Sequence, residues 1–308
     1  MTRLDIRPVS PILGAEVRGV QLADGVDDDT FAAVHAAFLR HGVLFLKDQA
    51  EPMSEATQTA FGRRFGPLHI HPAAPGSGDG DAIFVIHTHR ESKIANGNGW
   101  HSDVSCETEP PMATMLQIRR LPAGGGGDTL FADMEAAYAV LSADDRTFLE
   151  GLSALHTSEH IYRGRYEDRG VDDSGRTFPS AVHPVVRTHP ETGRPSIFVN
   201  RAFTTELVGL EEAHEAEAAQ VLRRLLAHCE LPEFQIRQRW DLNDVALWDN
   251  RRLQHYALWD YWPDERIGHR VTVFGDRPRF DPTAARPTDS SIRIRTEPIR
   301  PRPAASSD

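Results

Sequence analysis

Cysteine is nearly absent from this chain, which has only Cys106 and Cys229 among its 308 residues. Two cysteines are too few for a disulfide framework, and no pair has the CxxC spacing of zinc or redox sites. The sequence also lacks an apolar run of about 18 residues and a secretory signal at its N-terminus. We therefore expect a cytoplasmic protein that has no membrane partner.

Positive charge is also scarce. The chain has 34 lysines and arginines against 45 aspartates and glutamates, for a net charge of −11. Such a protein repels the phosphate backbone, so we expect no nucleic-acid partner. A small anionic ligand would have to be held by a few local cations that act against the field of the whole protein.

The composition is otherwise that of a globular protein, with 40% hydrophobic and 26% charged residues. The length suits one large domain, which we place at residues 1–276. After Asp276 the chain is rich in proline and arginine and poor in aliphatic residues. We expect residues 277–308 to form a C-terminal arm that is extended or partly disordered.

Short segments with strand patterns outnumber the helical segments and do not alternate with them regularly. This pattern favours a mainly β fold with flanking helices, built on a double-stranded β-helix (jelly-roll) core, over a wound α/β fold. Predicted helices start after Asp28 or Asp29, after Ser54 and after Ser142, and a longer one covers 211–229. Predicted strands lie within 4–22 and at 43–46, 68–72, 82–86, 112–118, 182–188, 195–199, 234–240, 244–248 and 268–274.

One short stretch, Gly-Trp-His-Ser-Asp-Val-Ser at 99–105, contains residues typical of a metal site. On an extended strand His101 and Asp103 would point to the same face. An imidazole beside a carboxylate supplies two ligands of a 2-His-1-carboxylate facial triad, which binds Fe(II) and leaves three positions open. His255, far downstream, can supply the third ligand. Because HxD is a common tripeptide in a chain with 15 histidines, the assignment depends on the motifs around it.

Several further motifs occur in a characteristic order over residues 4–276. Together they resemble the Fe(II)/2-oxoglutarate-dependent dioxygenases, and within them the taurine dioxygenase family, which includes alkylsulfatases and aryloxyalkanoate dioxygenases. The motifs are RRFG with LHIHP at 63–72, WHSD at 100–103, GGDT at 126–129, HPVV at 183–186, FVN at 198–200, WDN at 248–250, HY at 255–256 and HR at 269–270.

The resemblance implies that His101, Asp103 and His255 are the catalytic Fe(II) ligands. It places Thr129 and Arg266 at the far carboxylate of 2-oxoglutarate. There Thr129 would donate a hydrogen bond from its hydroxyl group, and the Arg266 guanidinium would donate charge-assisted hydrogen bonds. With O2 as the other cosubstrate, the implied reaction hydroxylates a C–H bond of a small anionic organic substrate and releases succinate and CO2. Sulfonates, sulfate esters and carboxylates are the candidate substrates.

Four residues are implied on the substrate side. Arg270 and His71 occupy positions at which relatives hold the anionic head group. Gly97 stands where taurine-using relatives have an asparagine, so taurine itself is in doubt, and the neighbouring Asn98 is a candidate replacement. Phe203 is a candidate pocket wall, although core packing would explain it equally well.

Other functions compatible with these residues stay open. A biosynthetic oxygenase could act on a carboxylate- or phosphate-bearing intermediate. A zinc hydrolase could use the same three ligands but would not require Thr129 and Arg266. A non-catalytic sensor would bind iron and release no succinate. Relatives are commonly dimers or tetramers, so we expect a homo-oligomer.

Overall fold

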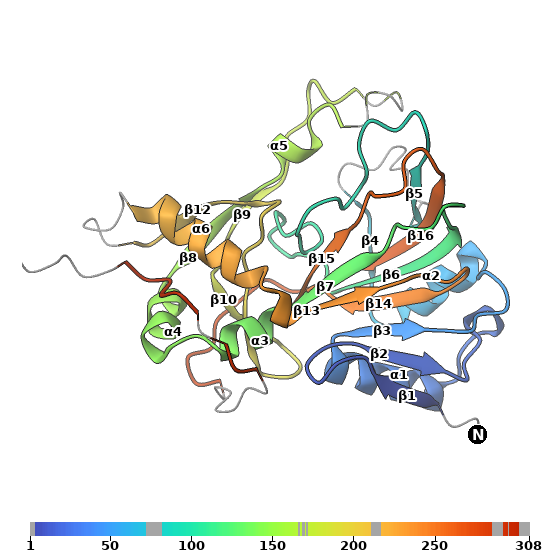
Figure 1. Cartoon of the computed structure of the whole chain (residues 1–308), viewed down its shortest axis with the longest axis horizontal. Coiled ribbons are helices and arrows are strands. Elements are labelled where there is room, and N and C mark those ends of the chain that lie inside the picture. The colour runs from blue at the N-terminus through green and yellow to red at the C-terminus, as the bar shows by residue number, and fades with distance from the viewer. Residues whose placement is uncertain are drawn as a thin grey trace, which may run out of the picture.

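The computed structural model describes residues 4–71, 82–165, 167, 170, 172–210, 217–284, 292–294 and 296–301. Within these residues β-strands predominate, and helices lie at both ends of the molecule (Figure 1). The protein is therefore mainly β with some helices, as the sequence predicts.

The largest sheet has eight strands and forms one side of the molecule (Figure 1). Its strands lie in the order β1 (Asp5–Pro8), β2 (Ala15–Arg18), β3 (Val43–Leu46), β14 (Val245–Asp249), β6 (Ala113–Arg120), β16 (Arg266–Val273) and β4 (Leu68–His69), and β5 (Phe84–Thr88) also pairs with β16.

Both faces of this sheet are covered, which explains the continuous apolar run of β3. Side chains alternate along a strand. Leu44 and Leu46 join the core beneath the helices α1 (Asp28–His41) and α2 (Glu55–Arg63), whereas Val43 and Phe45 point the other way.

The opposite face packs against a three-stranded sheet with the order β13 (Gln235–Gln238), β7 (Thr129–Asp133) and β15 (Leu253–Ala257). Phe131 is fully buried between the sheets, with its ring centre 5.7 Å from those of Phe45 and Trp248. The two sheets thus share one core, and the candidate site residues lie along it.

A second region packs beside the two sheets around its own core (Figure 1). There Ile299 is 1% exposed, and the Arg224 guanidinium donates to its carbonyl. The elements of this region are the helices α3 (Met134–Ala139), α4 (Ala143–Glu150), α5 (Glu159–Tyr162) and α6 (Ala218–Cys229), the sheet β12 (Thr204–Val208), β8 (Ser153–Thr157) and β9 (Ser180–Pro184), and the pair β10 (Val186–Thr188) and β11 (Pro195–Ile197).

Several expected boundaries need correction. The cap of α1 is Asp27, one residue before the predicted candidates, because its carboxylate accepts from Thr30 N. Strand β5 starts two residues later than expected, and β8, β12 and β15 were not predicted. The predicted helix at 211–229 is observed from Ala218, and residues 211–216 lie outside the described part of the chain.

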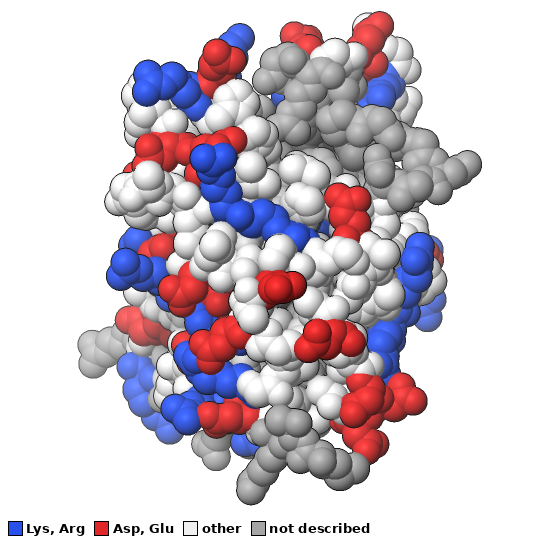
Figure 2. Space-filling view, turned by 90° about the vertical axis from the view of Figure 1, so that its right-hand side faces the viewer, with Lys and Arg blue, Asp and Glu red and all other residues white. Residues whose placement is uncertain are grey.

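On the face shown in Figure 2, acidic and basic side chains are interspersed and neither sign forms a continuous patch. Among the helices that the structure describes, none has the length and apolar character needed to span a bilayer.

Two buried histidines of the second region make the fold sensitive to acid. His156 on β8 and His183 on β9 are almost fully buried, and burial lowers their pKa values to about 3 and about 4. Both are neutral in the folded protein at pH 5, whereas they take up protons in the unfolded chain below about pH 6.5. The free energy of unfolding therefore falls on acidification, by about 2 kcal/mol between pH 6 and pH 5 for the pair.

Urea unfolding at pH 6 and pH 5 tests this prediction. The His156→Gln variant should show a shallower dependence, because one of the two groups no longer titrates. An unchanged pH dependence in that variant would contradict the assignment of His156 as a buried neutral group.

Candidate active site

The backbones of His101 and His255 form a reciprocal pair of hydrogen bonds. His101 N donates to His255 O at 3.1 Å, and His255 N donates to His101 O at 2.8 Å. His255 lies on β15, where it pairs with Phe131 of β7 in the interior. The bridge therefore fixes the segment around His101 to the three-stranded sheet and brings the two imidazole ring centres within 4.0 Å of each other.

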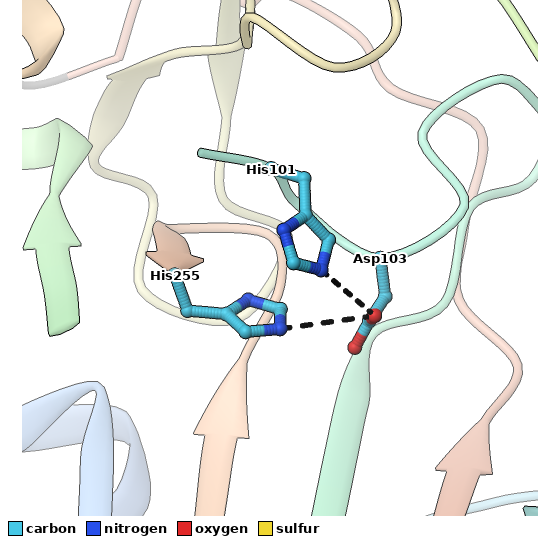
Figure 3. A group of neighbouring side chains, drawn as sticks. All are labelled: His101, Asp103 and His255. Atoms are coloured by element: carbon cyan, nitrogen blue, oxygen red, sulfur yellow. Dashed lines mark ion pairs between the residues drawn. The ribbon is translucent and has the colours of Figure 1, made fainter. Parts of the chain in front are cut away.

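The chain does not continue as a strand after His101, so the predicted placement of His101 and Asp103 on one strand face is wrong. Residues 103–106 form a turn, and Val104 has a φ of 46°. Ser102 Oγ donates to Asn250 O at 2.7 Å, which holds this turn in place. The turn nevertheless directs the Asp103 carboxylate toward both histidines, as Figure 3 shows.

These three side chains fit a metal ion. Asp103 Oδ1 lies 3.8 Å from His101 Nε2 and 3.9 Å from His255 Nε2, and the three ligand atoms lie within 4.8 Å of one another. With ligand distances of about 2.0–2.2 Å, as for zinc, two ligand atoms of one ion can be up to about 4.4 Å apart. The observed separations from Asp103 are therefore compatible with a shared ion.

The histidines are also in the protonation state that metal binding requires. Burial lowers the pKa of both His101 and His255, which favours neutral rings with a free nitrogen lone pair. His101 Nδ1 is 2.8 Å from Gly99 O, so the proton resides on Nδ1 and Nε2 is left free toward Asp103.

The two oxygens of Asp103 have different partners. Thr114 Oγ1 donates to Oδ2 at 2.6 Å, and Arg270 Nη1 donates to Oδ1 at 3.1 Å. Burial by itself would raise the pKa of this carboxyl, but Arg270, His255 and His101 outweigh it and hold the pKa below its usual range. Asp103 is therefore an anion at neutral pH, and its Oδ1 faces the histidines.

Arg266 and Thr129 meet in a cavity of about 50 Å³ that is also lined by His101 and His255. Arg266 is 3% exposed, and its Nε and Nη2 have no hydrogen-bond partner among the described residues. Thr129 Oγ1 accepts from Trp240 Nε1 at 3.1 Å, so its own proton can point elsewhere. A buried cation without an acceptor is costly, and a carboxylate of a small ligand would supply the acceptor.

Gly127 makes room for this arginine. Its φ is 74°, and an added Cβ would lie 2.9 Å from Arg266 Cδ. The glycine loop before β7 thus has a steric role that its sequence, read as a flexible connector, does not reveal.

A larger cavity of about 480 Å³ adjoins the first, and His101 and Arg270 line both. All four residues expected on the substrate side line it: His71, Asn98, Phe203 and Arg270. Arg266 and Arg270 lie on the same face of β16, as predicted, because they are four positions apart on one strand.

His71, Phe203 and Asn98 have different contacts in the wall of the larger cavity. The His71 ring stacks on Phe84 with ring centres 5.1 Å apart, and Phe203 is 4% exposed beside Tyr162. Asn98 is more exposed, and its amide donates to Ala257 O at 3.3 Å.

Sequence reasoning missed two residues of the site. Thr114, which orients Asp103, lies on β6 in a stretch with no motif to distinguish it from a core threonine. Arg165 lines the larger cavity from a segment without periodicity. Its position depends on how that segment folds back over the site, which no local pattern indicates.

Comparison with known proteins gives consistent matches. The family model described as "Taurine catabolism dioxygenase TauD, TfdA family" matches residues 5–272. An alkylsulfatase of Acinetobacter baylyi is 33% identical over 89% of this chain and 86% of its own length. An alpha-ketoglutarate-dependent sulfate ester dioxygenase of Pseudomonas putida is 34% identical over 89% of this chain and 91% of its own. The crystal structure of a taurine dioxygenase from Burkholderia xenovorans has a TM-score of 0.75 at 30% identity and covers 92% of this chain and 94% of its own.

The hydrogen bond from Thr114 to Asp103 generates a prediction for metal binding. Thr114→Val keeps the side-chain shape but removes the donor, so the carboxylate loses its orientation and metal affinity should fall about 10–100-fold. Titration of the metal-free protein with Mn(II) in competition with a chelator measures this effect. Thr114→Ser retains the hydroxyl and is the matched control. Equal affinity in the valine variant and the wild type would show that the hydroxyl does not orient Asp103.

Proposed function

The chain belongs to the taurine catabolism dioxygenase TauD, TfdA family, and from this membership and the site geometry we propose the residues that carry its activity. The protein is a 2-oxoglutarate-dependent non-haem iron dioxygenase that uses Fe(II), 2-oxoglutarate and O2. His101, Asp103 and His255 are the proposed metal ligands. Thr129 and Arg266 are the proposed cosubstrate ligands.

The observation that carries this proposal is the pair of buried, unpartnered nitrogens of Arg266, seen among the described residues, beside the three ligand side chains. A zinc hydrolase needs the three ligands but has no use for a buried arginine aimed at a neighbouring cavity. A dicarboxylate cosubstrate uses both, because one end can reach the metal and the other can take up the guanidinium.

The bound iron would activate O2, and 2-oxoglutarate would supply two electrons by oxidative decarboxylation to succinate and CO2, so that one oxygen atom of O2 ends in succinate and the other in a hydroxyl group on the substrate. The protein's own residues position and shield the reactants. Arg266 and Thr129 fix the far carboxylate of the cosubstrate, while Thr114 and Gly99 orient Asp103 and His101. The burial of Asp103 and His255 limits the access of bulk water to the metal position.

We propose that the substrate is a small organic anion, with a sulfonate, sulfate ester or carboxylate as its head group. Arg270 is 8% exposed, so it is a cation already removed from water. Its Nη1 donates to Asp103 Oδ1, the oxygen that also faces the metal position. When that carboxylate is a metal ligand, Arg270 becomes available for a substrate anion. His71, Asn98 and Phe203 complete the lining around this anion.

The relatives named above extend the proposal beyond the site. We propose that the two sheets over a common core form a jelly roll, that residues 1–276 are a single domain and that residues 277–308 are an arm attached to it. We also propose a cytoplasmic homo-oligomer, a dimer or a tetramer. Both cysteines are buried free thiols, which suits a reducing compartment.

Succinate release tests the assignment of the two arginines. The Fe(II)-loaded protein would be assayed with 2-oxoglutarate, O2 and a panel of sulfonates, sulfate esters, aryloxyalkanoates and phosphorylated metabolites. Arg270→Ala should keep the slow turnover seen without substrate and lose its stimulation by substrate. Arg266→Ala should instead weaken 2-oxoglutarate binding itself, by at least about tenfold, because a hydrogen-bonded charge pair is lost.

If both variants lost the same step, the assignment of one anion to each arginine would be wrong. Stimulation of succinate release by the phosphorylated compounds alone would favour a biosynthetic oxygenase. Iron binding without any succinate release would favour a sensor.

A further inference from the structure

The cavity on the substrate side carries more positive charge than the proposed reaction requires. Its lining includes Arg165, Arg201 and Arg270, but Asp103 is its only carboxylate among the described residues. His71 adds no charge, because burial lowers its pKa and keeps the ring neutral. This concentration of arginine is unexpected in a chain with a net charge of −11.

Two of these arginines already have carboxylate partners. Arg201 forms a bidentate pair with Glu230, with both N–O distances at 2.8 Å. Arg270 contacts Asp103, which is a proposed metal ligand. In the complete complex, the charges of Fe(II) and Arg266 are balanced by Asp103 and the two carboxylates of 2-oxoglutarate. Within the described part of the chain, Arg270 and Arg165 then have no carboxylate left to balance their charges.

Among the described residues, Arg165 has hydrogen bonds to neutral groups only. Its Nε donates to Asn96 Oδ1 at 3.1 Å, and its Nη2 donates to Ala95 O at 3.0 Å. No described carboxylate forms an ion pair with it. These two bonds connect the segment after α5 to the loop before the metal motif. They hold a partly buried guanidinium at the cavity wall, where no carboxylate of the described residues offsets its charge.

We propose that Arg165 binds a second acidic group of the substrate, so that the preferred substrate is an organic dianion with one acid at Arg270 and a separate acid at Arg165. The inference rests on the proposed function and refines its substrate class. Arg270 is bonded to Asp103 and Arg165 to Asn96 and Ala95, so the two guanidiniums occupy different places in the cavity lining and suit two acids joined by a carbon chain. Their charges explain why a strongly acidic protein can hold such a substrate: each acid meets a fixed cation at short range.

The test compares matched substrates that differ in one acid group. Alkanesulfonates of increasing length would be assayed against ω-carboxyalkanesulfonates with the same carbon number, with succinate release by the Fe(II)-loaded enzyme as the readout. The wild type should prefer a carboxylated member of the series. In Arg165→Gln, kcat/KM for that diacid should fall at least about tenfold, through KM, as expected for one hydrogen bond to a charged group. Its activity on the alkanesulfonate should be unchanged.

Two controls separate binding from loop structure. Arg163→Gln removes the same charge from the same segment, but Arg163 is exposed, pairs with Glu159 and does not line the cavity, so both substrates should be used as by the wild type. Calorimetric titration of the Zn(II)- and 2-oxoglutarate-loaded protein measures diacid binding without turnover, and it should show the same loss of affinity in Arg165→Gln.

Each other outcome contradicts the proposal. An equal loss on both substrates in Arg165→Gln would mean that Arg165 only connects the two segments. Turnover of alkanesulfonates with no preference for a diacid would refute this inference and leave the proposed function intact. Alkyl phosphates carry two charges on one head group. If they gave an equal increase in kcat/KM that also depended on Arg165, both arginines would bind one head group. No stimulation by any member would refute the proposed substrate class as well.

Discussion

The reciprocal backbone hydrogen bonds between His101 and His255 are the contact on which the rest of the site depends. They join residues far apart in the chain and require no particular side chain, so they leave both imidazoles free to face the same point. The bridge attaches the turn that carries Asp103 to β15, whose neighbour β7 is the central strand of the three-stranded sheet and buries Phe131 between the two sheets. The positions of the three ligands are therefore fixed by contacts to the core. Hydrogen bonds of Thr114 and Asn250 set only the final orientation of the carboxylate and of its turn.

Charge organises the site around this bridge. Arg266, Arg270 and Arg165 occupy successive positions from the small cavity to the wall of the large one, in a protein whose overall field repels anions. In a partly dehydrated cavity a nearby guanidinium outweighs distant surface charges that water and salt screen. In the function proposed here, local contacts would hold an anion that reaches the cavity, and the spacing of the arginines would select among anions.

Much of this could be predicted from sequence, and the failures have physical causes. The order of the motifs singled out His255, Arg266 and Arg270 as candidates, and the structure places all three at the lining of the two cavities. The same-face geometry of the two arginines follows from strand periodicity. The strand expected at His101–Asp103 is instead a turn, because hydrogen bonds from Ser102 and Asp103 to Asn250 outweigh local alternation. Strand β15 was missed since its apolar pattern is interrupted by Gln254 and His255. Thr114 and Arg165 act through tertiary contacts, which leave no local signal.

The central claim is that the three side chains hold Fe(II) beside a 2-oxo acid anchored at Arg266. Anaerobic addition of 2-oxoglutarate to the Fe(II)-loaded protein tests it most directly, because chelation of the metal by the 2-oxo acid produces a visible charge-transfer band. The band should develop saturably in the wild type and should require a much higher 2-oxoglutarate concentration in Arg266→Ala. Iron binding with no such band at any 2-oxoglutarate concentration would contradict it.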